Sequence, residues 1–294
     1  MDDISRRKHL TFEQAEGVEP LPEQLKLREL SQQLRARLWQ AIYLSISENV
    51  DMGSEIFNEP EAVTSNWLQI LYDKHVSREH KMADEFDNRP SAVLPSLKLI
   101  FSKGDYAQVF GFVQWVLRHP SCPYALSSAI DGALEDSRAA YRVVDEDTIV
   151  PIASDEELDS LKRAFDDVAA SEFSGARRHL RNAASELGAG NWSASVRESI
   201  HAVGSVARML DATSNTLTPA LSSLEKSIRV HSALKTGFGN LYGYTSDERG
   251  VRHALLDQGA PQVDETDALY MLGSCAAFVS YLINKARLAG FLKD

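Results

Sequence analysis

The residues best suited to chemistry lie together near the C-terminus, in the stretch from Leu241 to Leu256, LYGYTSDERGVRHALL. Three basic side chains in this stretch, Arg249, Arg252 and His253, follow an acidic pair. An imidazole can take and return a proton near neutral pH, and a guanidinium can stabilise negative charge that develops on an oxyanion. We therefore expect the site of the chain to lie here, with these three residues as its reactive members.

Each residue of this stretch also has a structural interpretation. Asp247 and Glu248 would orient the His or the Arg, but carboxylates equally favour the first turn of a helix. Tyr244 would stack on a nucleic-acid base, a contact worth about 1–3 kcal/mol, or would fill a core or an interface. Arg252 and His253 would otherwise form a turn and the start of a helix, because short motifs often occur by chance.

A second polar group lies on a predicted helix. Arg197 and His201 are four residues apart and so share one helical face, and Glu198 lies beside them. The three would support the site, or they would form an ordinary solvated face opposite the apolar seam.

The remaining motifs favour no metal and no cofactor. His75 and His80 are five residues apart, which is a poor spacing for two ligands on one helical face. The two cysteines, Cys122 and Cys275, form no CxxC pair and are expected to be reduced thiols. The chain has neither GxGxxG nor GxxxxGK[ST], which disfavours nucleotide-dependent enzymes.

Composition narrows the class of protein. The 31 Lys and Arg residues against 42 Asp and Glu give a net charge of -11 and a pI of about 5.3. This disfavours broad, sequence-independent binding to nucleic acid, which needs an extended basic surface, but it leaves room for a compact RNA site. The N-terminus has no apolar core of signal-peptide length, and no run of about 18 apolar residues occurs. We expect a cytoplasmic protein that does not enter membranes.

Apolar periodicity predicts helices in the first half of the chain. A stripe from Leu27 to Ile46 has spacings of three and four, and Gly104-Asp105 precedes another strongly apolar helix. The period then changes, since the β-rich runs AYRVV and TIVPI flank an acidic turn and predict a hairpin. The expected helices here are 27–46, 61–76, 93–101, 106–117 and 123–140.

The second half of the chain is also expected to be helical. Ser154 and Glu157 form an S-x-x-E capping box, so we place a domain boundary after Ala153. The predicted helices run from 154 to 187, 191 to 210, 219 to 234 and 264 to 289. The sequence thus predicts a mainly α protein with domains at 1–153 and 154–294, the first ending in a small β-hairpin.

Two stretches resemble known families. The Gly190-Asn191-Trp192 turn, the helix VRESIHAVGSVARML and the later Arg-His pair resemble HEPN domains, the four-helix bundles of toxins, antiphage effectors and CRISPR-associated ribonucleases. The N-terminal half resembles the AbiJ N-terminal domain of the fourth type, through FEQAEGVEPLPEQ before LRARLWQAIY and through YRVVDEDTIVPI. Together the two resemblances cover nearly the whole chain.

The resemblance implies an abortive-infection protein whose HEPN-like domain, as a homodimer, cleaves RNA (tRNA or mRNA) without a metal through an Arg-x4-6-His motif. In such a site the His moves the proton of the RNA 2′-hydroxyl and the Arg stabilises the phosphate. Arg249 and His253 have three residues between them rather than four to six. An inactive homodimeric scaffold that acts through a protein partner or a phage trigger therefore stays open as the alternative.

Overall fold

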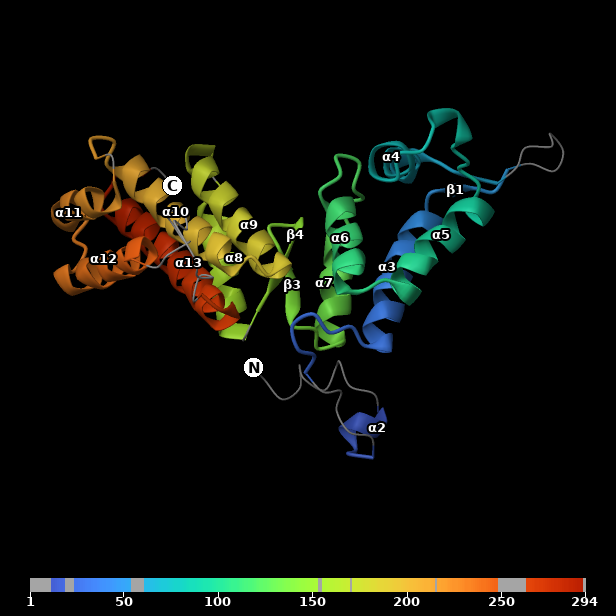
Figure 1. The fold of residues 1–294 in the computed structure, drawn as a ribbon, viewed down its shortest axis with the longest axis horizontal. Helices are drawn as coiled ribbons and strands as arrows, with labels where there is room; N and C mark the ends of the chain where they lie inside the picture. Colours follow the sequence, from blue (N-terminus) through green and yellow to red (C-terminus); the bar gives the residue numbers. More distant parts are fainter. Residues whose placement is uncertain are drawn as a thin grey trace, which may run out of the picture. The chain divides into compact units, whose positions relative to one another are not determined.

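The computed structural model describes residues 12–18, 24–53, 61–152, 155–169, 171–214, 216–247 and 263–292. The described elements are mainly helices with two short strand pairs, which confirms the predicted fold class, mainly α with a small hairpin. The chain divides into two compact units, residues 1–147 and 148–294 (Figure 1). The predicted boundary after Ala153 lies slightly beyond this division, and the two domain assignments stay predictions.

The N-terminal unit is built on a helix with one fully buried face. The elements of this unit are α2 (Phe12–Ala15), α3 (Gln32–Ser47), β1 (Val50–Asp51), β2 (Ala62–Val63), α4 (Ser65–Asp73), η1 (Lys74–Arg78), η2 (Ala83–Glu85), α5 (Pro90–Lys103), α6 (Tyr106–Leu117), α7 (Leu126–Asp136) and β3 (Tyr141–Val144). Ser31 caps α3 by accepting a hydrogen bond from the Leu34 N–H at 3.1 Å. Leu34, Leu38, Ile42 and Ile46 recur every four residues along α3 and have no exposed surface. The helix packs with this face against α5 and α7.

Two parts of this unit differ from the prediction. The apolar stripe predicts a helix from Leu27, whereas α3 begins at Gln32, because Arg28 has a φ of 67° and its N–H donates to the Tyr141 hydroxyl at 3.0 Å. A residue in this left-handed conformation cannot continue a right-handed helix. The antiparallel pair of β1 and β2 is also new, since strands of two residues are too short for alternation to reveal them.

The predicted hairpin is present. β3 and β4 (Thr148–Pro151) form a two-stranded sheet, and every residue in both strands is buried. Asp145 and Glu146 in the turn have φ values of 53° and 64°. The connection has three residues, and the Asp147 N–H donates to the Asp145 carbonyl oxygen at 2.8 Å.

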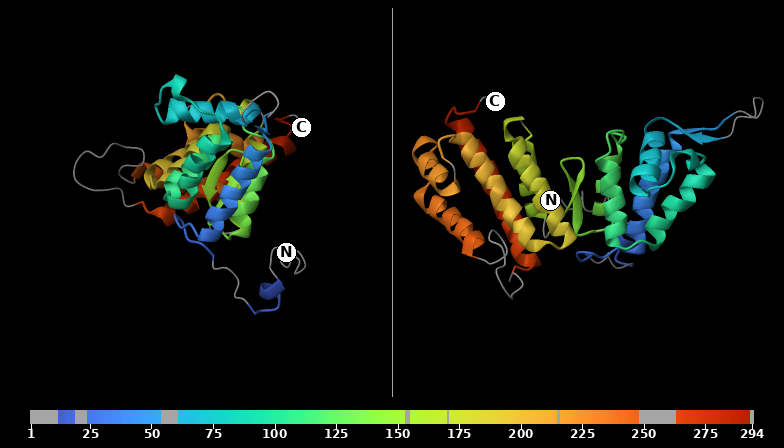
Figure 2. Two further views of the ribbon diagram at one scale, coloured as in Figure 1. Left: turned by 90° about the vertical axis from the view of Figure 1, so that its right-hand side faces the viewer. Right: turned by 45° about the horizontal axis from the view of Figure 1, so that its top comes forward.

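The C-terminal unit continues from β4 into a set of packed helices. These are α8 (Asp155–Asp167), η3 (Ser171–Phe173), α9 (Ser174–Ala189), α10 (Trp192–Leu210), α11 (Leu217–Ser227), α12 (Ser232–Asp247) and α13 (Glu265–Leu288). α10 packs against both α9 and α13, and the three helices lie side by side (Figures 1 and 2). α13 also packs against α8.

α13 is the central apolar helix of this unit. It begins with a capping box in which Asp264 and Asp267 each accept a hydrogen bond from the backbone N–H of the other. Among the described residues it is the one helix long and apolar enough to cross a membrane by length and composition, and half of that apolar window is buried within the protein. A core helix has the same composition, so this finding is consistent with a soluble protein.

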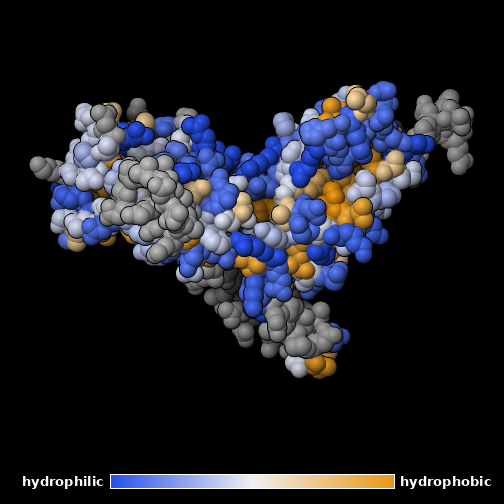
Figure 3. All heavy atoms as spheres, viewed as in Figure 1, coloured by the Kyte–Doolittle hydropathy of each residue, from blue (hydrophilic) through white to orange (hydrophobic). Residues whose placement is uncertain are grey.

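The surface of the N-terminal unit carries an apolar patch. Figure 3 shows polar residues over most of the visible surface of each unit and a group of apolar residues over α3 and α5. Leu44 on α3 and Leu99 on α5 are exposed by 51% and 59%.

Candidate functional site

Four of the predicted site residues near the C-terminus lie outside the described residues. These are Glu248, Arg249, Arg252 and His253, so their roles stay predictions. Asp247 is the last residue of α12, and Tyr244 lies half-buried in the last two turns of that helix.

The local structure expected around Tyr244 is wrong. The predicted helices end at 234 and resume at 264, so Leu241–Asp247 is expected to lie outside a helix, but this stretch continues α12. The break lies earlier, between α11 and α12, where Arg229 has a φ of 55°. Gly237, Gly239 and Gly243 all lie inside α12, because each helical glycine costs only about 1 kcal/mol relative to alanine and packing can offset that cost.

The supporting residues Arg197, Glu198 and His201 lie on α10, which pairs with α9 through a very short connection. Gly190 ends α9 in the left-handed conformation, with a φ of 81°, and α10 begins after Asn191. Two helices joined in this way run antiparallel, so residues equally far from Gly190 lie level with one another. His179 and His201 are eleven residues before and after Gly190, and Asn182 and Glu198 are eight before and after it.

Small residues let these two helices approach closely. Ala176, Ala183 and Ala184 are buried on α9, and Ser195, Ser199 and Ala202 are buried on α10. A Cβ on Gly175 would lie 2.8 Å from Ser205 Oγ, so a residue without a side chain suits this level of the pair. The close approach brings polar side chains at the edge of the seam within reach of one another.

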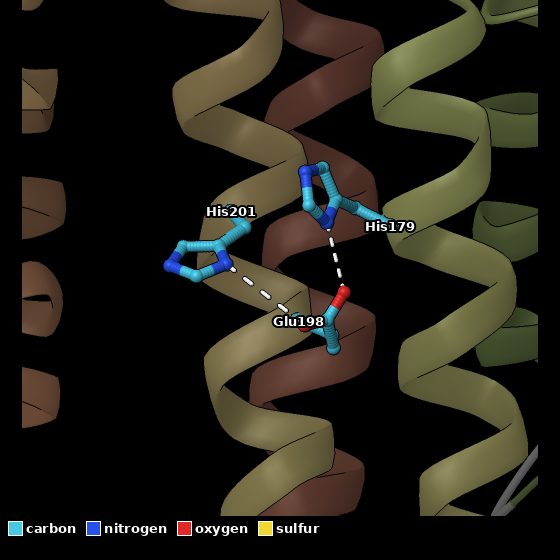
Figure 4. A group of neighbouring side chains, drawn as sticks. All are labelled: His179, Glu198 and His201. Carbon is cyan, nitrogen blue, oxygen red and sulfur yellow. Dashed lines mark hydrogen bonds and ion pairs between the residues drawn. The ribbon is translucent and has the colours of Figure 1, made fainter. Parts of the chain in front are cut away.

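At the edge of the α9–α10 seam three side chains converge: His179 from α9, with Glu198 and His201 from α10 (Figure 4). We call them the His–Glu–His cluster. His179 Nδ1 lies 2.8 Å from Glu198 Oε2, and His201 Nδ1 lies 4.0 Å from Glu198 Oε1. The centroids of the two imidazole rings are 5.3 Å apart. In Figure 4 the second ring nitrogen of each His points away from the carboxylate.

Two neighbours complete the surroundings of the carboxylate. Asn182 Nδ2 donates to Glu198 Oε2 at 3.3 Å, and Arg197 Nε lies 4.0 Å from Oε1. The side chain of Glu198 is only 16% exposed, whereas those of Arg197 and His201 are each 41% exposed. The cluster thus has a sheltered acid beneath side chains that solvent can reach.

The pKa of Glu198 reflects opposing effects. Burial by itself raises this pKa, but the hydrogen bonds from His179 and Asn182, together with the positive charges of His179 and His201, outweigh it. The net result is a pKa below the ordinary value for Glu, so the carboxylate is ionised at neutral pH. An ionised carboxylate only accepts hydrogen bonds, so Nδ1 of His179 carries the proton that they share.

This arrangement is suited to proton transfer. When neutral His179 donates its Nδ1 proton to Glu198, its Nε2 holds a lone pair that can accept a proton from a substrate. A carboxylate behind an imidazole fixes its tautomer and orientation and stabilises the imidazolium that forms. Arg197 adds a positive charge on the same edge, where a bound anion would meet it.

The three side chains of the cluster could also serve as ligands of a metal ion. One ligand atom from each of His179, Glu198 and His201 lies within 4.8 Å of the others. Two imidazoles and one carboxylate are a known ligand set for zinc, with a fourth position left open.

The sequence pattern gave two of the three members of the cluster and missed His179. This residue lies next to the buried Leu180, at the edge of the apolar stripe of α9, and therefore looks like part of the basic run RRHLR. His179 and His201 lie equally far from Gly190 along the chain, and this symmetry was the signal available in the sequence.

Comparison with known proteins identified no similar protein. The sequence matches no protein-family model, no curated protein and no solved structure.

Proposed function

We propose that the C-terminal unit cleaves RNA through acid–base chemistry of its own side chains. The observation that supports this function is the convergence of two imidazoles, a sheltered carboxylate and the Arg197 guanidinium at one partly exposed edge of the α9–α10 pair. Attack of the RNA 2′-oxygen on phosphorus needs a base that takes the hydroxyl proton, an acid that protonates the leaving oxygen, and a positive charge near the phosphate. The cluster and Arg197 provide all three.

The roles follow from the contacts. Nε2 of His179 takes the proton of the 2′-hydroxyl while the 2′-oxygen forms a bond to phosphorus. The bond from phosphorus to the 5′-oxygen breaks, and His201 in its protonated form gives that oxygen a proton. Arg197 stabilises the charge on the non-bridging oxygens, and Glu198 stabilises protonated His179. The products would be a 2′,3′-cyclic phosphate and a 5′-hydroxyl.

The test is cleavage of tRNA and total RNA by the purified full-length protein in EDTA, with the termini of the products identified. Because acid–base catalysis contributes typically 10²–10⁴-fold, we expect His179→Ala and Glu198→Gln to slow cleavage by at least about 100-fold. Arg197→Ala should also be slow, whereas Arg163→Ala, which removes an exposed cation from α8, should match wild type.

A second set of variants tests the residues predicted from the sequence. Loss of cleavage in Arg252→Ala and His253→Ala, with full activity in the cluster variants, would remove the cluster from the reaction. A wild-type protein that neither cuts nor binds RNA would favour the alternative function, an inactive scaffold.

The biological setting that we propose is abortive-infection defence against phage by a cytoplasmic homodimer. It is supported by the resemblance of the two halves of the chain to AbiJ N-terminal and HEPN domains. A monomer in sedimentation at micromolar concentration would contradict the dimer.

A further inference from the structure

The His–Glu–His cluster has the composition of a zinc site as well as that of an acid–base site. Its members come from two helices: His179 on α9, and Glu198 with His201 one turn apart on α10. Zinc bonds to imidazole nitrogen and carboxylate oxygen at about 2.0–2.2 Å, so ligand atoms in a tetrahedral site are about 3.4 Å apart. His179 Nδ1 lies 2.8 Å from Glu198 Oε2, His201 Nδ1 lies 4.0 Å from Oε1, and one ligand atom from each residue lies within 4.8 Å of the others, so small side-chain movements would bring the three to this separation.

The surroundings favour such a site in two further ways. Asn182 donates to the same carboxylate at 3.3 Å, and a hydrogen bond of this kind orients a ligand from outside the coordination shell. The exposure of His201 leaves a route for the ion and for a water molecule at the open fourth position. Arg197 is an unfavourable neighbour, since its Nε lies 4.0 Å from Glu198 Oε1.

We propose that His179, Glu198 and His201 bind a zinc ion, and that the bound ion holds the ribonuclease in an inactive form. The first part stands on the geometry of the cluster alone, and the second part rests on the proposed function. An imidazole that binds zinc through Nδ1 must carry its proton on Nε2. The proton of His179 therefore moves from Nδ1 to Nε2, the atom that would accept the 2′-hydroxyl proton, and the base is lost without any net gain or loss of protons.

The binding test uses zinc alone. The full-length protein, freed of metal by dialysis against EDTA and then against buffer, competes for zinc with a chromophoric chelator. We expect one zinc per chain, and an affinity at least about tenfold lower in His179→Gln, Glu198→Gln and His201→Gln. Arg163→Ala should bind like wild type. Arg197→Ala should bind about threefold more tightly or better, because it removes a positive charge near the ion.

A spectroscopic measurement guards against loss of the fold. Circular dichroism should show that the Gln variants keep their helices, and Co²⁺ in place of zinc should give a visible absorption band in wild type that His179→Gln lacks. The inference is overturned if wild type takes no zinc from the chelator, if the Gln variants bind like wild type, or if Arg197→Ala gains nothing.

The two proposals can fail separately. Zinc added to an active preparation should stop RNA cleavage, and EDTA should restore it. If cleavage in EDTA is confirmed but zinc is not bound, only the zinc site is lost. If zinc binds as expected and cleavage requires it, the site stands, while inhibition by zinc and metal-free cleavage are both refuted.

Discussion

α13 offers a direct test of the core of the C-terminal unit. Leu282 has no exposed surface, while Leu288, in the last turn of the same helix, is 86% exposed. Replacing each by alanine makes the same chemical change in the same helix, and Leu and Ala have similar helix propensities. The difference between the two variants therefore isolates the effect of burial.

The expected size follows from the side chain that is removed. Leu→Ala deletes three carbons, each worth about 0.8 kcal/mol when buried, and the cavity left behind brings the usual total to about 3–5 kcal/mol. Leu282→Ala should lower the free energy of unfolding by this amount, and Leu288→Ala by less than about 0.5 kcal/mol.

The assay is urea unfolding followed by two probes. Far-ultraviolet circular dichroism reports on both helical units, whereas tryptophan fluorescence reports mainly on the N-terminal unit, which contains Trp39, Trp67 and Trp115 of the four tryptophans. Leu282→Ala should shift a circular dichroism transition to lower urea while the fluorescence midpoint stays unchanged. Equal midpoints for the two variants would refute the inferred core, and a larger loss in Leu288→Ala would show that its exposed face is covered in solution.

Two further predictions concern titratable groups. Burial raises the pKa of Cys275 to about 12, and burial together with the nearby charge of Asp147 raises the pKa of Cys122 to about 11. The thiolate is the nucleophile, so both cysteines should react with a disulfide reagent at pH 7.5 far more slowly in the native protein than in urea. Rapid reaction of both in the native state would contradict this burial. The hydrogen bond from His119 lowers the pKa of Asp73, so its contribution to stability is present above the ordinary Asp value of about 3.9 and is lost as the pH falls through the folded-state value. Urea midpoints of wild type and Asp73→Asn should therefore converge as the pH falls below about 4. A difference between the two midpoints that does not change with pH would count against this contribution of Asp73.

The sequence predicted best the helices over 106–117 and 264–289, whose apolar stripes are uninterrupted, whereas it predicted one helix over 154–187 where α8 and α9 are separate helices. The helix after Asp105 begins with a capping box to Gln108, and the last helix begins with Asp264 as predicted. The parts it missed depend on contacts between distant residues. Arg28 leaves the helical conformation where its N–H meets the hydroxyl of Tyr141, more than a hundred residues away, and no local pattern contains that information.

The candidate site was predictable only in part for a similar reason. The spacing of Glu198 and His201 shows that they share a helical face, but it does not show what faces them. That required the antiparallel pairing about Gly190, which sets His179 level with His201. The stretch around Arg252 was chosen for its residue types alone, and it lies outside the described residues.

The solvated-face interpretation of the α10 polar group does not fit Glu198, whose side chain is 16% exposed and accepts hydrogen bonds from His179 and Asn182. A purely structural contact between His179 on α9 and Glu198 on α10 would also explain this burial. In that case Glu198→Gln and His179→Ala would destabilise the protein whether or not the cluster has a function. His201 separates the two explanations, because its side chain is 41% exposed, whereas that of Glu198 is 16% exposed. Its removal should change stability by less than about 1 kcal/mol. If His201→Ala keeps the stability of wild type but loses both zinc binding and RNA cleavage, the cluster is a site; if it keeps all three, His201 belongs to neither proposed site.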